Sequence, residues 1–243
     1  MQLFRGDCLE LMRDIPNGSI DMILCDLPYG TTACKWDTII PFDELWKQYK
    51  RIIKGNGAIV LFGSEPFSTS LRHSNLKMFR YDWIWRKPKG SGFLNAKRMP
   101  LKNHEIASVF YKKLPTYNPQ FTHGKPYSNK QGYVGEYLNN GNLKQVESVS
   151  DGRRYPVSVQ DFSIDTGQHP TQKPVALLEY LVKTYTNEGD TVLDNCMGSG
   201  STGVACVNTG RKFIGMELEE KYFDIAKERI EEAQTNASSF CLD

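Results

Sequence analysis

The chain has 243 residues, of which 40% are hydrophobic and 24% charged, and a chain of this size and composition can bury a full core as one catalytic domain with an insertion. The net charge is only +2, so composition allows nucleic-acid binding but does not argue for it. We expect no signal peptide and no membrane span, and we therefore expect a cytoplasmic protein. The six cysteines contain no C-x-x-C pair and the four histidines show no ligand spacing with them, so we expect reduced thiols and no metal site.

The first half of the chain alternates apolar runs with stretches of helical periodicity, as α/β domains do. The predicted strands span residues 2–7, 20–25, 58–63, 81–86 and 104–111. The predicted helical segments span residues 8–14, 42–54 and 66–73. Gly55-Asn56-Gly57 is expected to end the second helix, and residues 31–40 are expected to form a polar loop.

An unusual loop follows one of these strands. The apolar run 20–25 ends in Asp26-Leu27-Pro28-Tyr29. Asp26 can accept a hydrogen bond from an amino group, Pro28 stiffens the turn, and Tyr29 offers a flat face on which a heterocycle can stack. The loop could therefore hold the exocyclic amine of a base and remove its proton, although the tetrapeptide alone fits an ordinary Asp-x-Pro turn equally well.

A basic, glycine-bearing loop is predicted at 87–98, between the strands at 81–86 and 104–111. Its cationic side chains are Lys87, Lys89, Lys97 and Arg98, and the loop contains one aromatic residue. Contact with DNA phosphates is one interpretation, and a solvated loop is the simpler alternative.

Residues 112–168 break the α/β rhythm, because they show little periodicity and interleave tyrosines with lysines. Lys125, Arg153 and Arg154 add charge beside aromatic residues in this segment, which suits contact with phosphates and unstacked bases. We interpret residues 112–165 as an inserted DNA-reading region, with a flexible solvated linker as the alternative.

The last third of the chain returns to regular elements. Residues 174–185 predict a helix with Pro174 in its first turn, and residues 219–233 predict another, followed by a frayed tail at 233–243. Between these helices the sequence predicts short strands at 191–194 and 212–216.

The segment from Thr191 to Gly203 reads as a strand, a glycine-rich turn and the start of a helix at Ser201. Gly198 and Gly200 allow the backbone to approach a ligand closely. The next strand ends in Glu217, where a ribose would present its hydroxyls. The unit is thus a candidate half-site for a nucleoside cofactor.

Two cofactors fit that half-site. The spacing Gly198-x-Gly200-x-x-Gly203 matches the dinucleotide fingerprint and keeps NAD open. S-adenosylmethionine is favoured because Asp194 stands before the glycines, where it could pair with an ammonium group. No chain of three βα units follows Glu217, and the Asp26 loop has no evident role in hydride transfer.

These residues resemble the amino-methyltransferases of DNA that modify adenine-N6 or cytosine-N4. The family's catalytic signature Asp/Asn/Ser-Pro-Pro-Tyr/Phe is similar to Asp26–Tyr29, and its cofactor signature is similar to Asp194–Thr202. Phe4–Cys8 and His169–Pro174 resemble two further family segments. Because the catalytic motif comes first, the order resembles that of the family's permuted β group.

The resemblance implies a set of site residues, double-stranded DNA as the substrate and a monomer or homodimer. The implied catalytic residues are Asp26, Leu27, Pro28 and Tyr29. The implied cofactor-binding residues are Asp7, Cys8, Asp26, His169, Thr171, Lys173, Asp194, Cys196, Gly198, Gly200, Ser201, Thr202 and Glu217. The implied domains are a catalytic and cofactor-binding domain at 1–111 and 166–232, and a target-recognition insertion at 112–165 that includes Lys125, Arg153 and Arg154. Asp7 could equally be the N-cap of the helix at 8–14.

One departure from the signature is that Leu27 replaces the first proline. The family uses the backbone carbonyl at this position as a second acceptor for the target amine, and leucine keeps that carbonyl. An Asp in first place leans the target toward adenine. The alternatives that remain are cytosine-N4, a base in RNA or an amide in a protein as the target, and a catalytically inactive DNA-binding module.

The expected fold is α/β, with a single mixed, mostly parallel sheet, helices on both faces and an irregular insertion. The strands at 2–6 and 20–25 must lie beside the strand at 191–194 for Asp7, Asp26, Asp194 and Glu217 to converge at one carboxyl edge.

Overall fold

The computed structural model describes residues 1–30, 37–131, 146–165 and 172–239. The chain forms two compact units, the larger built from Met1–Asn118 with Ser158–Asp243 and the smaller from Pro119–Val157. None of the described helices is long and apolar enough to cross a membrane.

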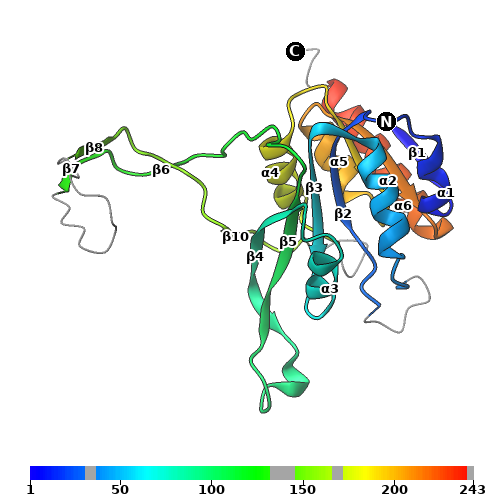
Figure 1. Ribbon diagram of the computed structural model, residues 1–243, viewed down its shortest axis with the longest axis horizontal. Coiled ribbons are helices and arrows are strands. Elements are labelled where there is room, and N and C mark those ends of the chain that lie inside the picture. Colours follow the sequence, from blue (N-terminus) through cyan, green and yellow to red (C-terminus); the bar gives the residue numbers. More distant parts are fainter. Residues whose placement is uncertain (31–36, 132–145, 166–171, 240–243) are drawn as a thin grey trace. The chain divides into compact units, whose positions relative to one another are not determined.

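The larger unit is built on an eight-stranded sheet in the order β1-β12-β11-β2-β3-β5-β4-β10 (Figure 1). Its strands are β1 (Gln2–Arg5), β2 (Ile20–Asp26), β3 (Ile53–Gly63), β4 (Phe79–Ser91), β5 (Lys102–Phe110), β10 (Val159–Asp161), β11 (Thr191–Asp194) and β12 (Lys212–Glu217). Within this sheet only β5 runs against the other strands. The mixed, mostly parallel sheet confirms the expected fold class.

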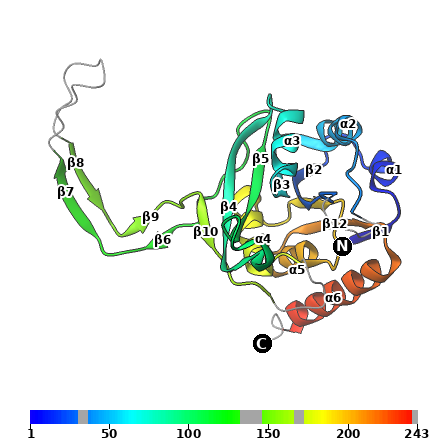
Figure 2. The same cartoon turned by 90° about the horizontal axis from the view of Figure 1, so that it is seen from below.

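Helices cover both faces of the sheet (Figure 2). They are α1 (Cys8–Leu11), η1 (Met12–Asp14), α2 (Phe42–Ile52), α3 (Phe67–Ser74), α4 (Val175–Tyr185), α5 (Ser201–Asn208) and α6 (Glu220–Ser239). Successive side chains of β2 point to opposite faces, as a strand requires. Met22 and Leu24 pack in a core with α4, α5 and α6, whereas Ile23 and Cys25 pack in a second core with η1, α2 and α3.

Strand register brings the two ends of the chain together. β2 pairs in parallel with β11, and β11 pairs in parallel with β12, which in turn pairs with β1. Asp26, Asp194 and Glu217 are the last residues of β2, β11 and β12. The carboxyl ends of parallel strands share one edge, so these three acidic residues gather there, as the sequence predicts.

In its described residues the smaller unit forms an antiparallel ribbon of four short strands. They are β6 (Thr122–His123), β7 (Tyr127–Gln131), β8 (Val146–Ser150) and β9 (Arg153–Arg154). β7 pairs with β8, and β6 pairs with β9. The insertion was expected to span 112–165, but residues 158–165 belong to the larger unit because β10 pairs with β4 and the Trp85 indole N–H donates to the Phe162 carbonyl, at 2.9 Å.

Two predicted boundaries around the glycine run after α2 are wrong. α2 ends at Ile52 and not at 54, and β3 begins at Ile53 and not at 58. The glycines lie within β3, where the pairing with β2 shifts register. A Cβ on Gly57 would lie 2.7 Å from the Asp21 carbonyl oxygen, so the glycine permits the strand to bend rather than ending the helix.

The predicted loop at 87–98 and the predicted frayed tail also need correction. β4 continues to Ser91 and pairs there with Lys102, so Lys87 and Lys89 lie on a long hairpin, and the turn η2 (Phe93–Asn95) follows. Antiparallel pairing with β5 extends strand β4 through this segment, although its glycines favour a turn or loop. α6 extends to Ser239 rather than ending at 233, because no Gly or Pro interrupts it.

A close approach between the glycine turn and α6 generates a stability prediction. Gly200 has φ +80, and a Cβ there would lie 2.9 Å from the Ala226 Cα. Gly189 has the same φ, but nothing lies within 4 Å of its Cβ position. Gly200→Ala should therefore lower the free energy of unfolding by about 2–4 kcal/mol, from backbone strain plus overpacking, and Gly189→Ala by about 1–2 kcal/mol from strain alone.

Urea unfolding of both variants measures this difference. The gain in stability from restricting the unfolded chain is common to the two substitutions, so their difference isolates the contact with α6. Equal losses would contradict the packing described for Gly200.

Candidate active site

The carboxylate of Asp26, at the end of β2, is held by two neighbours. The Tyr29 hydroxyl donates a hydrogen bond to Asp26 Oδ1 at 2.5 Å. The Lys173 ammonium donates to Asp26 Oδ2 and forms an ion pair with it. The carboxylate is therefore oriented from both sides before any ligand binds.

The rest of the loop is fixed by packing. Leu27 is buried in the second core, and Pro28 is half-buried. The Tyr29 ring stacks on Phe67 of α3, with centroids 5.0 Å apart and 28° between the ring planes. The Lys173 ammonium also lies over the Tyr29 ring, 5.9 Å from its centroid, so the ring is held by Phe67 and Lys173 together.

Lys173 lies between two carboxylates in a nearly dry position, with 7% of its side chain exposed. Its Nζ lies 3.2 Å from Glu105 Oε2 on β5, and Glu105 also pairs with Lys87 on β4. Burial disfavours the ammonium, but Asp26 and Glu105 outweigh that effect and raise the pKa of Lys173. Burial likewise disfavours the Glu105 carboxylate, but Lys173 and Lys87 prevail and lower its pKa. The row Asp26–Lys173–Glu105–Lys87 connects the catalytic loop to the base of the β4–β5 hairpin.

Asp194 is the buried acid of the glycine turn. Its Oδ2 accepts from the Thr202 hydroxyl at 2.6 Å, and its Oδ1 accepts from the Cys196 backbone N–H at 3.1 Å. Burial raises the pKa of Asp194 to about 6 despite these hydrogen bonds. None of the described lysines or arginines forms an ion pair with Asp194 or Glu217. Both carboxylates thus lack a neutralising cation among the described residues.

The two glycines of the turn have different roles. Gly200 contacts α6, as described above, whereas nothing lies within 4 Å of a Cβ position on Gly198, which has φ +51. The Gly198 N–H donates to Glu217 Oε2 at 2.9 Å, and burial raises the pKa of Glu217. Gly198 and Glu217 together form an open cradle at the ends of β11 and β12.

Asp7 caps α1, which is the alternative that the sequence left open. Its Oδ1 accepts from the backbone N–H groups of Leu9 and Glu10, at 2.7 and 3.3 Å. The adjacent Cys8 shares a small polar cluster with Cys196, because the Asn195 amide nitrogen lies 3.5 Å from each sulfur. The contact with Cys196 is the main cause of the lowered pKa of Cys8.

The remaining predicted residues lie in several places. Ser201 is buried beside Arg229, and His169 and Thr171 lie outside the described residues. Lys89, Lys97 and Arg98 are exposed on the hairpin, while Lys87 is paired at its base.

In the smaller unit Lys125 is exposed, but both arginines have partners within the ribbon. Arg153 pairs with Asp151. Arg154 donates to the Lys125 carbonyl at 2.7 Å and lies over the Tyr127 ring at 4.8 Å. Arg154 thus holds the ribbon together.

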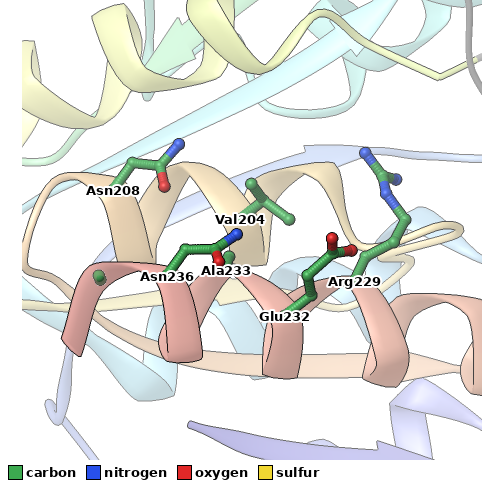
Figure 3. Close-up of a pocket in the computed structure, with 7 residues that line it drawn as sticks. Val204, Asn208, Arg229, Glu232, Ala233 and Asn236 are labelled. Atoms are coloured by element: carbon green, nitrogen blue, oxygen red, sulfur yellow. The ribbon is translucent and has the colours of Figure 1, made fainter. Parts of the chain in front are cut away.

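Two residues near the site had no signal in the sequence. Glu105 lies inside a strand and pairs with Lys173 across the fold. Arg229 of α6 donates to the Ser199 carbonyl at 2.5 Å and so fixes the glycine turn. Arg229 also lines a pocket of about 510 Å³ between α5 and α6, on the outer side of these helices (Figure 3). That pocket is lined by neither Asp26 nor Asp194.

The buried position of Lys173 predicts a large stability effect. Lys173→Met would leave Asp26 and Glu105 without their shared cation, so the free energy of unfolding should fall by about 3 kcal/mol. Lys54→Met removes a partly exposed ion pair with Asp21, 2.7 Å long, in which 41% of the Lys54 side chain is exposed, and should cost about 1 kcal/mol. Chemical denaturation of the two variants measures both, and similar losses would contradict the buried network.

The comparisons with known proteins agree with this geometry. A family model described as DNA methylase matches residues 20–228. The Type II methyltransferase M.HinfI of Haemophilus influenzae is 28% identical, over 99% of this chain and 71% of its own. The Type II methyltransferase M2.MboI of Moraxella bovis is 27% identical, over 95% of this chain and 87% of its own.

Two solved structures share the fold. The crystal structure of the M1.HpyAVI–SAM complex has a TM-score of 0.64 at 26% identity, covering 94% of this chain and 98% of its own. The cytosine-N4-specific PvuII DNA methyltransferase has a TM-score of 0.65 at 16% identity, covering 97% of this chain and 91% of its own. At this identity the similarity shows the fold alone. The family model spans well over half of the chain, and the motifs described above lie in or beside it, so this protein belongs to the N6/N4 DNA methylase family.

Proposed function

We propose that this chain transfers a methyl group from S-adenosylmethionine to the exocyclic amine of a base in double-stranded DNA, with adenine N6 as the target. The observation that carries the proposal is the convergence of Asp26 with Asp194 and Glu217 at the ends of neighbouring strands. The Asp in first place of the catalytic loop supports adenine over cytosine-N4.

The residues present fit the cofactor. When bound, S-adenosylmethionine supplies an electrophilic methyl group on a sulfonium. Asp194, which is buried and lacks a cationic partner among the described residues, would meet the methionine ammonium. Glu217 would accept from the ribose hydroxyls, beside the open Gly198. Asp7 and Cys8 would border the adenine ring, together with Cys196.

Asp26 and the Leu27 carbonyl would hold the target amine. An aromatic amine is a poor nucleophile because its lone pair is delocalised into the ring. Two acceptors that bind both N–H groups draw the nitrogen toward a tetrahedral geometry and free the lone pair. Such orientation accounts for ~7–11 kcal/mol in favourable cases.

Lys173 would hold Asp26 in its charged form, because its ammonium is already paired with Asp26 Oδ2. On accepting the methyl group, whose bond to the sulfonium sulfur would break to leave a neutral thioether, the target nitrogen would gain positive charge and lose its proton to Asp26 or to a water molecule. Glu105 shares Lys173 with Asp26 and can retain the ammonium when Asp26 takes the proton. Lys173 is therefore a positioning residue next to the acceptor.

The target amine lies inside a duplex, so the base must leave the stack, at a cost of about a few kcal/mol. Tyr29 would stack on the everted base. Lys89, Lys97 and Arg98 of the hairpin and Lys125 and Arg153 of the ribbon, all exposed, would contact phosphates.

Removal of the catalytic carboxylate tests the proposal. Asp26→Ala should lower kcat for DNA methylation about 10²–10⁴-fold and leave S-adenosylmethionine binding nearly unchanged. Asp21→Asn changes an acidic residue at the opposite end of the same strand and should keep kcat within about threefold.

Incorporation of labelled methyl groups into DNA, followed by analysis of the modified nucleoside, measures these effects. N6-methyl-2′-deoxyadenosine is the expected product, and N4-methyl-2′-deoxycytidine would show that the target is cytosine N4, the second candidate. Wild-type protein that binds DNA but methylates no DNA would be an inactive binding module. Labelling of RNA or protein in place of DNA would overturn the choice of substrate.

The raised pKa of Asp194 predicts how cofactor binding depends on pH. Because the pKa is about 6, only about a tenth of the carboxylate is charged at pH 5, so affinity should be about tenfold weaker at pH 5 than at pH 8. The Asp194→Asn variant should bind S-adenosylmethionine weakly at both pH values. Isothermal titration measures both, and equal wild-type affinity at pH 5 and pH 8 would remove Asp194 from this role.

Weaker binding of S-adenosylmethionine at pH 5 cannot come from unfolding of the protein on protonation of Asp194. A carboxyl whose pKa is higher in the folded than in the unfolded state stabilises the fold when it is protonated. This contribution to the free energy of unfolding is fully present at pH values below the ordinary pKa of Asp, and it is lost as pH rises through about 6. Protonation of Asp194 at pH 5 therefore stabilises the free protein while it weakens the binding of a cation.

A further inference from the structure

The β4–β5 hairpin extends past the edge of the sheet at which the acidic residues gather. β5 runs against β3 and pairs Ile106 with Gly63, the last residue of β3, so residues 86–104 lie beyond that strand (Figure 1). At the base of the hairpin, Lys87 and Glu105 join the ion-pair row that ends at Asp26. The hairpin is thus tied to the catalytic loop within one compact unit.

The tip of the hairpin is an ordered turn. Gly92 has φ +90, and the backbone N–H groups of Asn95 and Ala96 donate to the carbonyls of Gly92 and Phe93, at 2.9 and 3.1 Å. The Met99 N–H donates to the Asn95 carbonyl at 3.0 Å. These bonds fix the direction of the side chains that the turn carries.

Those side chains are large, apolar and exposed. Leu94 is 102% exposed, Phe93 71% and Met99 58%. Single exposed apolar residues are ordinary on a protein surface, but a cluster of three on one short turn marks a contact site.

The charged residues that flank the apolar tip indicate what it binds. Lys89, Lys97, Arg98 and Lys102 surround the apolar tip, and no acidic residue occurs between Asp82 and Glu105. The described residues provide no ion-pair partner for these four cations. A rigid apolar tip within a ring of cations matches the combination of stacked bases and phosphates that duplex DNA presents.

We propose that Phe93 and Leu94 form a wedge that enters duplex DNA between base pairs and stabilises the opened duplex while the target base occupies the site at Asp26. The proposal rests on the proposed function. It assigns the apolar tip a task separate from methyl transfer, which is to lower the cost of base extrusion. The flanking cations bind the phosphates on either side of the opened step.

The test compares two duplexes that carry the methylation site mapped by sequencing DNA modified by the wild-type protein. One duplex is fully paired, and in the other the target base lies opposite an abasic position, where extrusion costs least. Phe93→Ala with Leu94→Ala should lower kcat/KM at least tenfold on the paired duplex and less than threefold on the abasic duplex. Leu114→Ala, a leucine 78% exposed beyond the opposite end of β5, should leave both values unchanged.

Any other outcome contradicts the proposed role of Phe93 and Leu94. Equal losses on the two duplexes would make the tip a general DNA contact, and no loss would remove it from the reaction. A change of oligomeric state in sedimentation, with equal losses on both duplexes, would make the tip an interface between copies of this chain. If the wild-type protein methylates neither duplex nor any other DNA, the proposed function itself fails, which a defect confined to the double variant cannot imitate.

Discussion

The parallel pairing of β2 with β11 is the constraint on which the site depends. β2 is near the beginning of the chain and β11 near its end, yet Met22 and Ile23 lie in register with Val192 and Leu193 at the centre of the sheet. All four side chains are fully buried, so a shift by one residue would move each of them out of its own core and into the core on the other face of the sheet. This register sets Asp26 and Asp194 at the same edge. The chemistry of the site therefore follows from packing on the two faces of the sheet.

Electrostatics divides that edge into two parts. Asp26 is matched by Lys173, and Glu105 shares the same ammonium. Asp194 and Glu217 have no such partner among the described residues, and burial raises the pKa of both. The first part keeps a carboxylate charged and oriented, while the second remains short of positive charge until a ligand supplies it. One sheet edge thus holds an ion-paired carboxylate beside two carboxylates that have no ion-pair partner among the described residues.

The amino-acid sequence predicted the architecture of the edge but not its internal contacts. The strand ends at Asp26, Asp194 and Glu217 follow from local patterns, because an apolar run that stops at an acidic residue is visible in sequence. The pairing of Lys173 with Glu105 joins segments far apart in the chain, and no local pattern encodes it. The turn preference of glycine also gave the wrong prediction at Gly57 and Gly90, which lie within the paired strands β3 and β4. At both positions neighbouring backbone or side chains leave no room for a Cβ. Asp7 shows the opposite case, since the capping role that the sequence offers as an alternative to cofactor binding is present in the structure.

The reversed direction of β5 has a consequence for how such a protein can diversify. Because β5 returns the chain to the opposite edge, the segment that leads to the smaller unit starts away from the acidic residues, where Asn118 bonds to the carbonyls of Thr184 and Thr186. The chain re-enters the larger unit at Ser158, beside β4. Both junctions are fixed by backbone bonds that do not involve the residues between them. Residues 119–157 can consequently change in sequence and length while the bonds at both junctions, and with them the fold of the larger unit, stay the same.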